Sequence, residues 1–227
     1  MMRRTLMVII AALLMTVALS HAANNERIDG NRVQCANLVY AGNKTSVCFS
    51  DRFLKRLETD TKMQTDAKFH KVRLDDANQL ANYPFAVMTG EGGFRLTERE
   101  RINLRYYLNH GGFLLASAGC SSTEWITSFR REFALLYPTK RLAKLPLTHA
   151  IFRTVYNIKS LRTSHETHGP AAAALEGYTI GKRLALVFSP DGLNDTDHAE
   201  NCCCCGGDEV TNSEYVNVNL LAYALLH

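Results

Sequence analysis

The sequence predicts a three-layer α/β sandwich built on a mostly parallel sheet. Short apolar runs typical of buried strands alternate along the chain with longer segments of helical periodicity. The junctions between them are short and rich in glycine, which suits direct connections between strand and helix. Strands are expected at 32–40, 68–74, 83–89, 113–116 and 183–189, and helices at 52–61, 97–110, 124–136 and 215–226.

The clearest helix signal is a capping box formed by Thr97 and Glu100, whose side chains can each bond to a backbone amide at the start of the helix. Gly111-Gly112 ends this helix. Its buried side is expected to consist of four residues, Ile102, Leu104, Tyr107 and Leu108.

Polar residues mark the starts of the other helices. Asp51 is expected to cap the helix at 52–61, Asp75-Asp76 to open a short helical segment, and Ser122 or Thr123 to cap the helix at 124–136. The 124–136 helix carries core residues at helical spacing, namely Trp125, Phe129, Phe133 and Leu136. The final helix is expected to bury Val216, Val218, Leu220, Leu221 and Leu225, and residues 154–158 to form an edge strand.

The first 22 residues predict export. Arg3-Arg4 precedes an apolar run of fifteen residues from Thr5 to Leu19, and Ser20-His21-Ala22 supplies the small residues of a cleavage site. The run is short for a membrane span. We therefore expect 1–22 to be a cleaved signal peptide and 23–227 to be a single domain without a membrane span, periplasmic or secreted.

Composition argues against a nucleic-acid partner. The formal net charge is +4, and the basic residues are scattered instead of being interleaved with aromatic residues in one stretch. A glycine loop, Gly90-Glu91-Gly92-Gly93, follows the strand at 83–89. Such loops can cradle anions, but the spacing matches neither the phosphate-loop nor the dinucleotide fingerprint. The sequence leaves partners otherwise undefined.

Four of the seven cysteines form one unbroken run, Cys202 to Cys205, followed by two glycines. Successive side chains of such a run point in different directions, so the segment is expected to be a bent loop that presents sulfur. An odd number of cysteines leaves at least one without a disulfide partner within the chain. Cys48 is either a small apolar filler or the disulfide partner of Cys35.

Several candidate residues follow predicted strands and are therefore expected to share the carboxyl rim of the sheet, where ligands of α/β proteins bind. They are Cys48, the loop from Thr89 to Gly93, Cys120 and the cysteine run. A metal or redox site is the first hypothesis, with Cys202, Cys203, Cys204, Cys205, Cys120 and Cys48 as ligands. Thiolates select zinc, copper(I) or iron–sulfur, and Asp195, Asp197, His198, Asp208 and Glu209 flank the run.

Two alternatives remain open. In one, Cys120 is the nucleophile of a hydrolase or transferase, activated by the following helix N-terminus and by His149, His165 or His198. Thr89, Glu91 and Ser121 would then face the substrate. In the other, the chain is a non-catalytic interaction module whose cysteine loop is held by disulfides. The His165–His168 pair lacks the spacing of a metalloprotease helix and is expected to lie in a loop.

Six segments together resemble domain of unknown function 4159, a set of bacterial proteins: 83–100, 104–122, 128–133, 187–196, 202–210 and 217–227. The resemblance implies a flavodoxin-like sandwich of the class I glutamine amidotransferase type. The helix followed by G-G-F-L-L is also similar, more distantly, to trehalose-utilisation-type proteins of the same fold. In amidotransferases of that fold a nucleophilic cysteine sits on a strand-to-helix elbow. Cys120 lies at such a junction, but S-A-G-C-S-S departs from the glycine-x-cysteine-x-glycine pattern of those enzymes.

Overall fold

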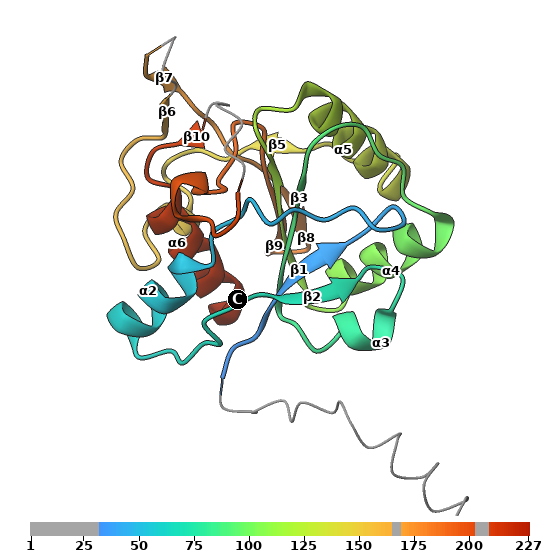
Figure 1. Cartoon of the computed structure of the whole chain (residues 1–227), viewed down its shortest axis with the longest axis horizontal. Coiled ribbons are helices and arrows are strands. Elements are labelled where there is room, and N and C mark those ends of the chain that lie inside the picture. The colour runs from blue at the N-terminus through green and yellow to red at the C-terminus, as the bar shows by residue number, and fades with distance from the viewer. Residues whose placement is uncertain (1–31, 165–168, 203–208) are drawn as a thin grey trace, which may run out of the picture. The chain divides into compact units, whose positions relative to one another are not determined.

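A seven-stranded sheet forms the centre of the protein, in the strand order β2-β1-β3-β4-β9-β8-β5 (Figure 1). The computed structural model describes residues 32–164, 169–202 and 209–227. The first five strands in that order are mutually parallel, while β8 and β5 run antiparallel at one edge. The strands are β1 (Cys35–Val39), β2 (His70–Arg73), β3 (Phe85–Gly90), β4 (Phe113–Ala118), β5 (Ala143–Lys144), β8 (Glu176–Ile180) and β9 (Arg183–Ser189).

Helices cover both faces of this sheet and complete the predicted three layers (Figure 1). One face carries α2 (Arg52–Thr61) and α6 (Ser213–Leu226), and the other carries α3 (Ala77–Leu80), α4 (Glu98–Asn109) and α5 (Thr123–Leu136). The predicted sandwich is therefore confirmed. The smaller elements are the short helical turns η1 (Ala150–Phe152) and η2 (Thr196–His198) and a three-stranded sheet of β6 (Arg162–Ser164), β7 (Ala171–Ala172) and β10 (Glu209–Val210).

Two apolar cores result from the alternation of side chains along each central strand. On β3, Ala86 and Met88 face the α4–α5 layer, whereas Phe85 and Val87 face the α2–α6 layer. All four residues are fully buried. This two-sided burial explains why the sequence shows β3 as a continuous apolar run.

Helix starts agree with the sequence at three of the four predicted positions, including Asp76, whose side chain accepts a bond from the amide of Gln79 at the start of α3. Thr97 and Glu100 form the complete capping box of α4, and the Ser122 side chain accepts a bond from the amide of Trp125 at the start of α5. Asp51 makes no side-chain cap at α2, so that prediction is wrong. Its carboxylate instead lies 3.4 Å from Nζ of Lys68.

Two other predictions need correction. Ile102 is 59% exposed, because α4 presents only Leu104, Tyr107 and Leu108 of the four apolar residues to the sheet. Residues 154–158 form bends and irregular backbone instead of an edge strand. The antiparallel edge is built by β8 and β5, which the sequence did not predict because their polar and glycine-containing composition lacks an apolar run.

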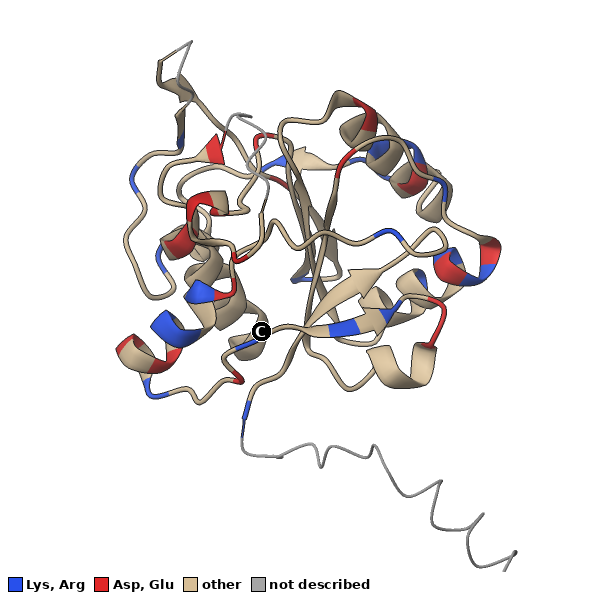
Figure 2. Cartoon of the chain, viewed as in Figure 1, with Lys and Arg blue, Asp and Glu red and all other residues tan. Residues whose placement is uncertain are grey.

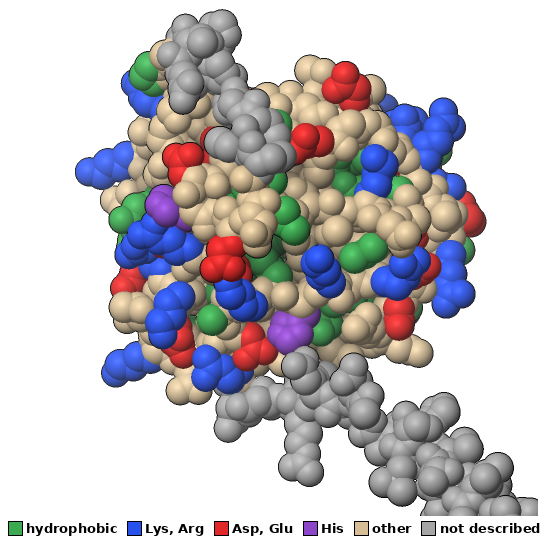
Figure 3. Space-filling view, viewed as in Figure 1, with side chains coloured by type: hydrophobic (Ala, Val, Ile, Leu, Met, Phe, Trp, Pro, Cys, Tyr) green, Lys and Arg blue, Asp and Glu red, His purple; other side chains and the backbone are tan. Residues whose placement is uncertain are grey.

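Lys and Arg side chains are interspersed with Asp and Glu on the face shown in Figure 3, in agreement with the scattered charge of the sequence. Among the described residues, no helix has the length and apolar character needed to cross a membrane. The predicted signal peptide at 1–22 lies outside the described residues.

Candidate functional site

At the carboxyl rim of the parallel strands, several loop residues have unusual backbone conformations. Five non-glycine residues in loops that follow these strands have positive φ angles: Ala41 (48°), Cys120 (49°), Ser121 (52°), Asp195 (53°) and Asn201 (62°). The left-handed region is costly for residues with a Cβ and is often retained at functional sites. The strand order places the topological switch point between β1 and β3, the usual ligand crevice of flavodoxin-like sheets.

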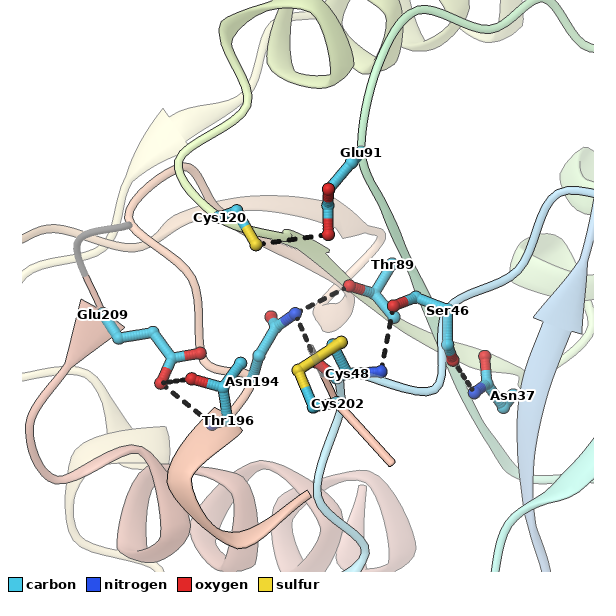
Figure 4. The surroundings of a disulfide bond; sticks show 10 residues. All are labelled: Asn37, Ser46, Cys48, Thr89, Glu91, Cys120, Asn194, Thr196, Cys202 and Glu209. Atoms are coloured by element: carbon cyan, nitrogen blue, oxygen red, sulfur yellow. Dashed lines mark hydrogen bonds between the residues drawn. A yellow bond between two sulfur atoms is a disulfide. The ribbon is translucent and has the colours of Figure 1, made fainter. Parts of the chain in front are cut away.

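A disulfide between Cys48 and Cys202 joins the loop after β1 to the loop after β9 (Figure 4). Their Cα atoms lie 4.8 Å apart, although 154 positions separate them in the sequence. The suggested pairing of Cys48 with Cys35 is therefore wrong. Cys35 is a free cysteine at the start of β1, and its complete burial raises the pKa of its thiol.

Asn194, a buried residue in the loop after β9, fixes the backbone of Cys48 by hydrogen bonding. Its side-chain amide donates to the carbonyl oxygen of Cys48 at 2.8 Å and to Oγ1 of Thr89 at 3.0 Å. Its side-chain oxygen accepts a bond from the hydroxyl of Ser117. Asn194, Thr89 and Ser117 are all fully buried, so the network is shielded from water and fixes the loops after β1 and β9 to the ends of β3 and β4.

The other side of Cys48 is fixed by Ser46. The Cys48 amide donates to Oγ of Ser46 at 3.0 Å, and the Ser46 carbonyl accepts a bond from the side chain of Asn37 on β1 at 2.8 Å (Figure 4). Both backbone polar groups of Cys48 are therefore engaged, and Cys48 itself is only 4% exposed. Cys202 is half-buried and is therefore the more exposed residue of the pair.

Cys120 lies on a sharp elbow between β4 and α5. The elbow comprises Gly119, Cys120 and Ser121, and the last two have left-handed backbone. The Gly119 amide donates to the Gly90 carbonyl at 3.0 Å, and a Cβ on Gly119 would lie 3.1 Å from that same oxygen. The elbow is thus pressed against the loop after β3, and Sγ of Cys120 lies 3.2 Å from Oε1 of Glu91. Cys120 is itself disulfide-bonded.

Acidic residues support the loop that leads to Cys202. His198 Nδ1 lies 2.8 Å from Oδ1 of Asp195, while Glu209 Oε2 accepts bonds from the amide and hydroxyl of Thr196 at 3.0 and 3.1 Å. Oδ2 of Asp195 and Oε1 of Glu209 are buried without a hydrogen-bond partner among the described residues. Desolvation, together with the charges of Asp195 and Asp197, raises the pKa of Glu209.

The predicted site residues meet only in part. Cys48, Cys202, Cys120, Thr89 and Glu91 share the rim, as the strand assignments predicted. Thr89 has no exposed surface, so it supports the site from beneath. Ser121 is half-buried in the Cys120 elbow. Cys203, Cys204, Cys205, Asp208 and His165 lie outside the described residues.

The two other candidate histidines, His149 and His198, contact Tyr223 and Asp195. The ring of His149 packs 5.8 Å from that of Tyr223 on α6, and desolvation lowers the pKa of His149. His198 pairs with Asp195, as described above. Within the part of the chain that the structure describes, no three His, Cys, Asp or Glu side chains are grouped to hold a metal ion.

The sequence did not reveal Asn194 or Ser117 as site residues. Both follow or end a predicted strand, in P-D-G-L-N and F-L-L-A-S respectively, but isolated amides and hydroxyls carry no motif. Their role depends on long-range packing, since 77 positions separate them.

The chain belongs to the family described as domain of unknown function (DUF4159), whose model matches residues 34–225. This match confirms the family resemblance drawn from the sequence. No curated protein matches the chain. The match covers every strand of the central sandwich, its helices except for the last residue of α6, and both cysteines of the described disulfide.

Proposed function

We propose that this protein is an exported thiol–disulfide redox protein whose centre is the Cys48–Cys202 disulfide. The observation that supports this most directly is the position of the bond, which links the loops after β1 and β9 at the carboxyl rim. That rim is where sheets of this strand order place their ligands. Disulfides persist in oxidising compartments, in agreement with the signal peptide expected at 1–22.

The proposed reaction is exchange with a dithiol. A thiolate of the dithiol attacks Sγ of Cys202, which is more exposed than Cys48, and the Cys48 sulfur leaves as a thiolate that takes a proton. The second thiol of the reductant then breaks the mixed disulfide and releases Cys202. Two electrons and two protons pass to the protein, and the dithiol becomes a disulfide.

Neighbouring sulfur favours exchange over a static crosslink. Cys203 to Cys205 follow Cys202 directly in the sequence, so further cysteines are covalently close to the bond. Cys120 contributes another sulfur at the end of β4. A purely structural crosslink needs only one pair of cysteines, whereas exchange uses a nearby attacking or resolving sulfur.

The reduced centre would present thiolates to a soft metal. Cys48 and Cys202, whose Cα atoms are 4.8 Å apart, can direct both sulfurs at one ion, and Cys120 with Cys203 to Cys205 would complete the shell. Zinc, copper(I) and iron–sulfur all accept such ligands, and the bound group would supply Lewis-acid or electron-transfer chemistry. The disulfide-bonded state offers no thiolate at Cys48 or Cys202, so metal binding belongs to the reduced state.

A second candidate function is a hydrolase or transferase that uses Cys120 as nucleophile. The left-handed elbow between β4 and α5 favours this alternative, because it presents the side chain ahead of a helix N-terminus. Glu91, 3.2 Å from the sulfur, would orient it or face the substrate together with Ser121. The disulfide at Cys120 would have to be reduced before such chemistry.

The test combines differential alkylation with elemental analysis of protein purified from the export compartment. We expect a dithiol to expose Cys48 and Cys202 together under native conditions, while buried Cys35 stays unmodified and serves as the internal control. Metal that binds only after reduction would support the thiolate shell. A Cys48–Cys202 bond that opens only on unfolding would instead identify the non-catalytic, disulfide-held module.

A further inference from the structure

We propose that a basic hollow beside the carboxyl ends of β1 and β3 binds a phosphoryl group, as free phosphate or as a phosphate monoester. The hollow has a volume of about 420 Å³ and lies between the loop after β1, the loop after β3 and α5. Three cationic side chains line it, one from each of these segments: Lys44, Arg95 and Arg131. Figure 2 shows basic residues on the loop after β1 and along α5.

The main chain at two of these cationic residues, Lys44 and Arg95, is fixed by hydrogen bonds and by packing. Tyr40 and Lys44 exchange two backbone hydrogen bonds, of 2.9 and 2.8 Å, which close a tight loop and fix the Lys44 backbone beside the end of β1. Arg95 lies between two buried residues, Phe94 and Leu96. The Phe94 amide also donates to Oγ of Ser128 on α5 at 3.0 Å, so the segment is anchored on both sides.

The hollow keeps an excess of positive charge. Within the described residues neither Lys44 nor Arg95 pairs with a carboxylate. Arg131 lies 3.2 Å from Glu132, but that buried carboxylate is shared with Arg101 at 3.0 Å. An anion of charge −2 would therefore meet uncompensated cations.

Another carboxylate lies close to the hollow, and its oxygens point at backbone amides. Glu100 is 3% exposed and accepts bonds from the amides of Ala41 and Thr97 at 2.6 and 2.7 Å. Its charge is partly balanced by these donors, which fix the first residue after β1 and the start of α4. Glu100 thus helps to shape the hollow.

Gly93 supplies an opening in the wall of the hollow. Its φ angle lies outside the left-handed region, and the only atom within 4 Å of a Cβ built there would be Oγ of Ser128 at 3.7 Å. Neither backbone conformation nor packing requires glycine at this position. The absence of a side chain leaves the main chain open to close approach by a ligand, which is a common use of glycine.

Phosphoryl is the ligand class that these features fit best. Planar guanidinium groups bind phosphate oxygens in pairs, and lysine adds a mobile point charge. The hollow also lies at the switch point of the sheet, where this strand order places ligand sites. This assignment goes beyond the redox proposal and does not depend on the state of any cysteine.

Calorimetric titration with inorganic phosphate, and separately with glycerol 3-phosphate, tests the site at low ionic strength. We expect the double variant Lys44→Gln/Arg95→Gln to raise the Kd at least about tenfold, since two of three cations are lost. Added salt should weaken binding to the wild type, because the cations are exposed. Tighter binding of the ester would indicate a monoester ligand, and equal or weaker binding of the ester would indicate the free ion; either result supports the site.

The matched control is Lys182→Gln, which removes an exposed lysine in the turn between β8 and β9, at the opposite end of the sheet. Because Lys44 and Arg95 are exposed and unpaired among the described residues, the double variant should unfold at the wild-type temperature. Equal weakening in the Lys182→Gln protein, or no phosphate binding by the wild type, would overturn the proposal. The redox state of Cys48 and Cys202 would be unaffected by either result.

Discussion

The two ends of the parallel sheet are built by different means. At the amino ends of β4 and β9, the chain turns on glycines, Gly111 and Gly181, whose positive φ angles cost little. Arg183 then donates to the carbonyls of Gly112 and Leu108, which ties the start of β9 to the end of α4. At the carboxyl ends, non-glycine residues adopt left-handed conformations around buried polar groups and a disulfide.

This difference indicates where the proposed redox chemistry would take place. A turn that serves folding alone can use glycine, as the turns before β4 and β9 do. Strained backbone at Cys120, Ser121 and Asp195, and unpaired buried oxygens on Asp195 and Glu209, lower stability and therefore call for a functional reason. We expect changes at the amino end to affect stability alone, and changes at the carboxyl end to affect both stability and redox behaviour.

The largest expected effect is loss of the disulfide. Cys48→Ser/Cys202→Ser should lower the free energy of unfolding by about 2–5 kcal/mol, because the bond closes a loop of 154 positions. Urea denaturation measures the change. Cys35→Ala is the matched control, since it removes a buried cysteine thiol and leaves the disulfide intact. A loss no larger than that of the control would show that the bond constrains the chain little.

Removal of the buried amide comes next. Asn194→Ala leaves the Cys48 carbonyl and the Thr89 and Ser117 hydroxyls without this partner and should lower the free energy of unfolding by about 3 kcal/mol. It should also shift the midpoint potential of the disulfide, because Cys48 loses a support. Chemical denaturation and redox titration are measured together.

Gly112→Ala provides the matching change at the amino end. A Cβ there would lie 2.3 Å from the Tyr107 ring, so we expect a loss of about 2 kcal/mol with an unchanged midpoint potential. If Gly112→Ala shifted the potential as far as Asn194→Ala, the contrast between the two ends would fail.

The glycine loop after β3 should respond unequally along its length. Gly90→Ala would place a Cβ 2.6 Å from the hydroxyl of Tyr40, which links Trp125 Nε1 to the Thr89 carbonyl, and should cost about 1–3 kcal/mol. Gly93→Ala would place a Cβ in ordinary contact with Oγ of Ser128, at 3.7 Å, and should change stability by less than about 0.5 kcal/mol. Thermal unfolding of the two variants measures both changes in stability. Equal losses of stability in the two variants would contradict the prediction.

The fold was largely readable from the sequence because its signals are local. The Thr97–Glu100 capping box, the glycines after α4 and the apolar runs of β3, β4 and β9 each depend on neighbouring residues. The convergence of sulfur at one rim also followed, since parallel strands bring their carboxyl ends together.

The partners within that rim could not be predicted. Cys48 pairs with Cys202 instead of Cys35 because loop geometry, which the sequence does not encode locally, sets the distance between sulfurs. Cys35 is much nearer to Cys48 in the sequence than Cys202 is, but its side chain is buried in the α2–α6 core. Asn194 could not be predicted for the same reason. Its partners are Cys48 in the loop after β1, Thr89 on β3 and Ser117 on β4, which are all distant from it in the sequence.

The smallest expected effect concerns pH. Since the pKa of Glu209 is raised by burial, its contribution to stability is greatest below its ordinary pKa of 4.5 and is lost as the pH rises through the higher folded-state value. Glu209→Gln keeps an oxygen for Thr196 and removes the charge. We expect the variant to gain stability relative to the wild type as the pH rises above 4.5. Denaturation across this range is the measurement, and a constant difference would contradict the assignment.

The midpoint potential of the Cys48–Cys202 disulfide tests the redox centre most directly. The full-length protein is equilibrated with defined dithiol–disulfide buffers, alkylated, and read by mass spectrometry at each cysteine. We predict a potential above about −300 mV, with Cys48 and Cys202 reduced together in the folded protein. A potential well below that value, with reduction only on unfolding, would contradict the redox proposal and leave the bond as a structural crosslink.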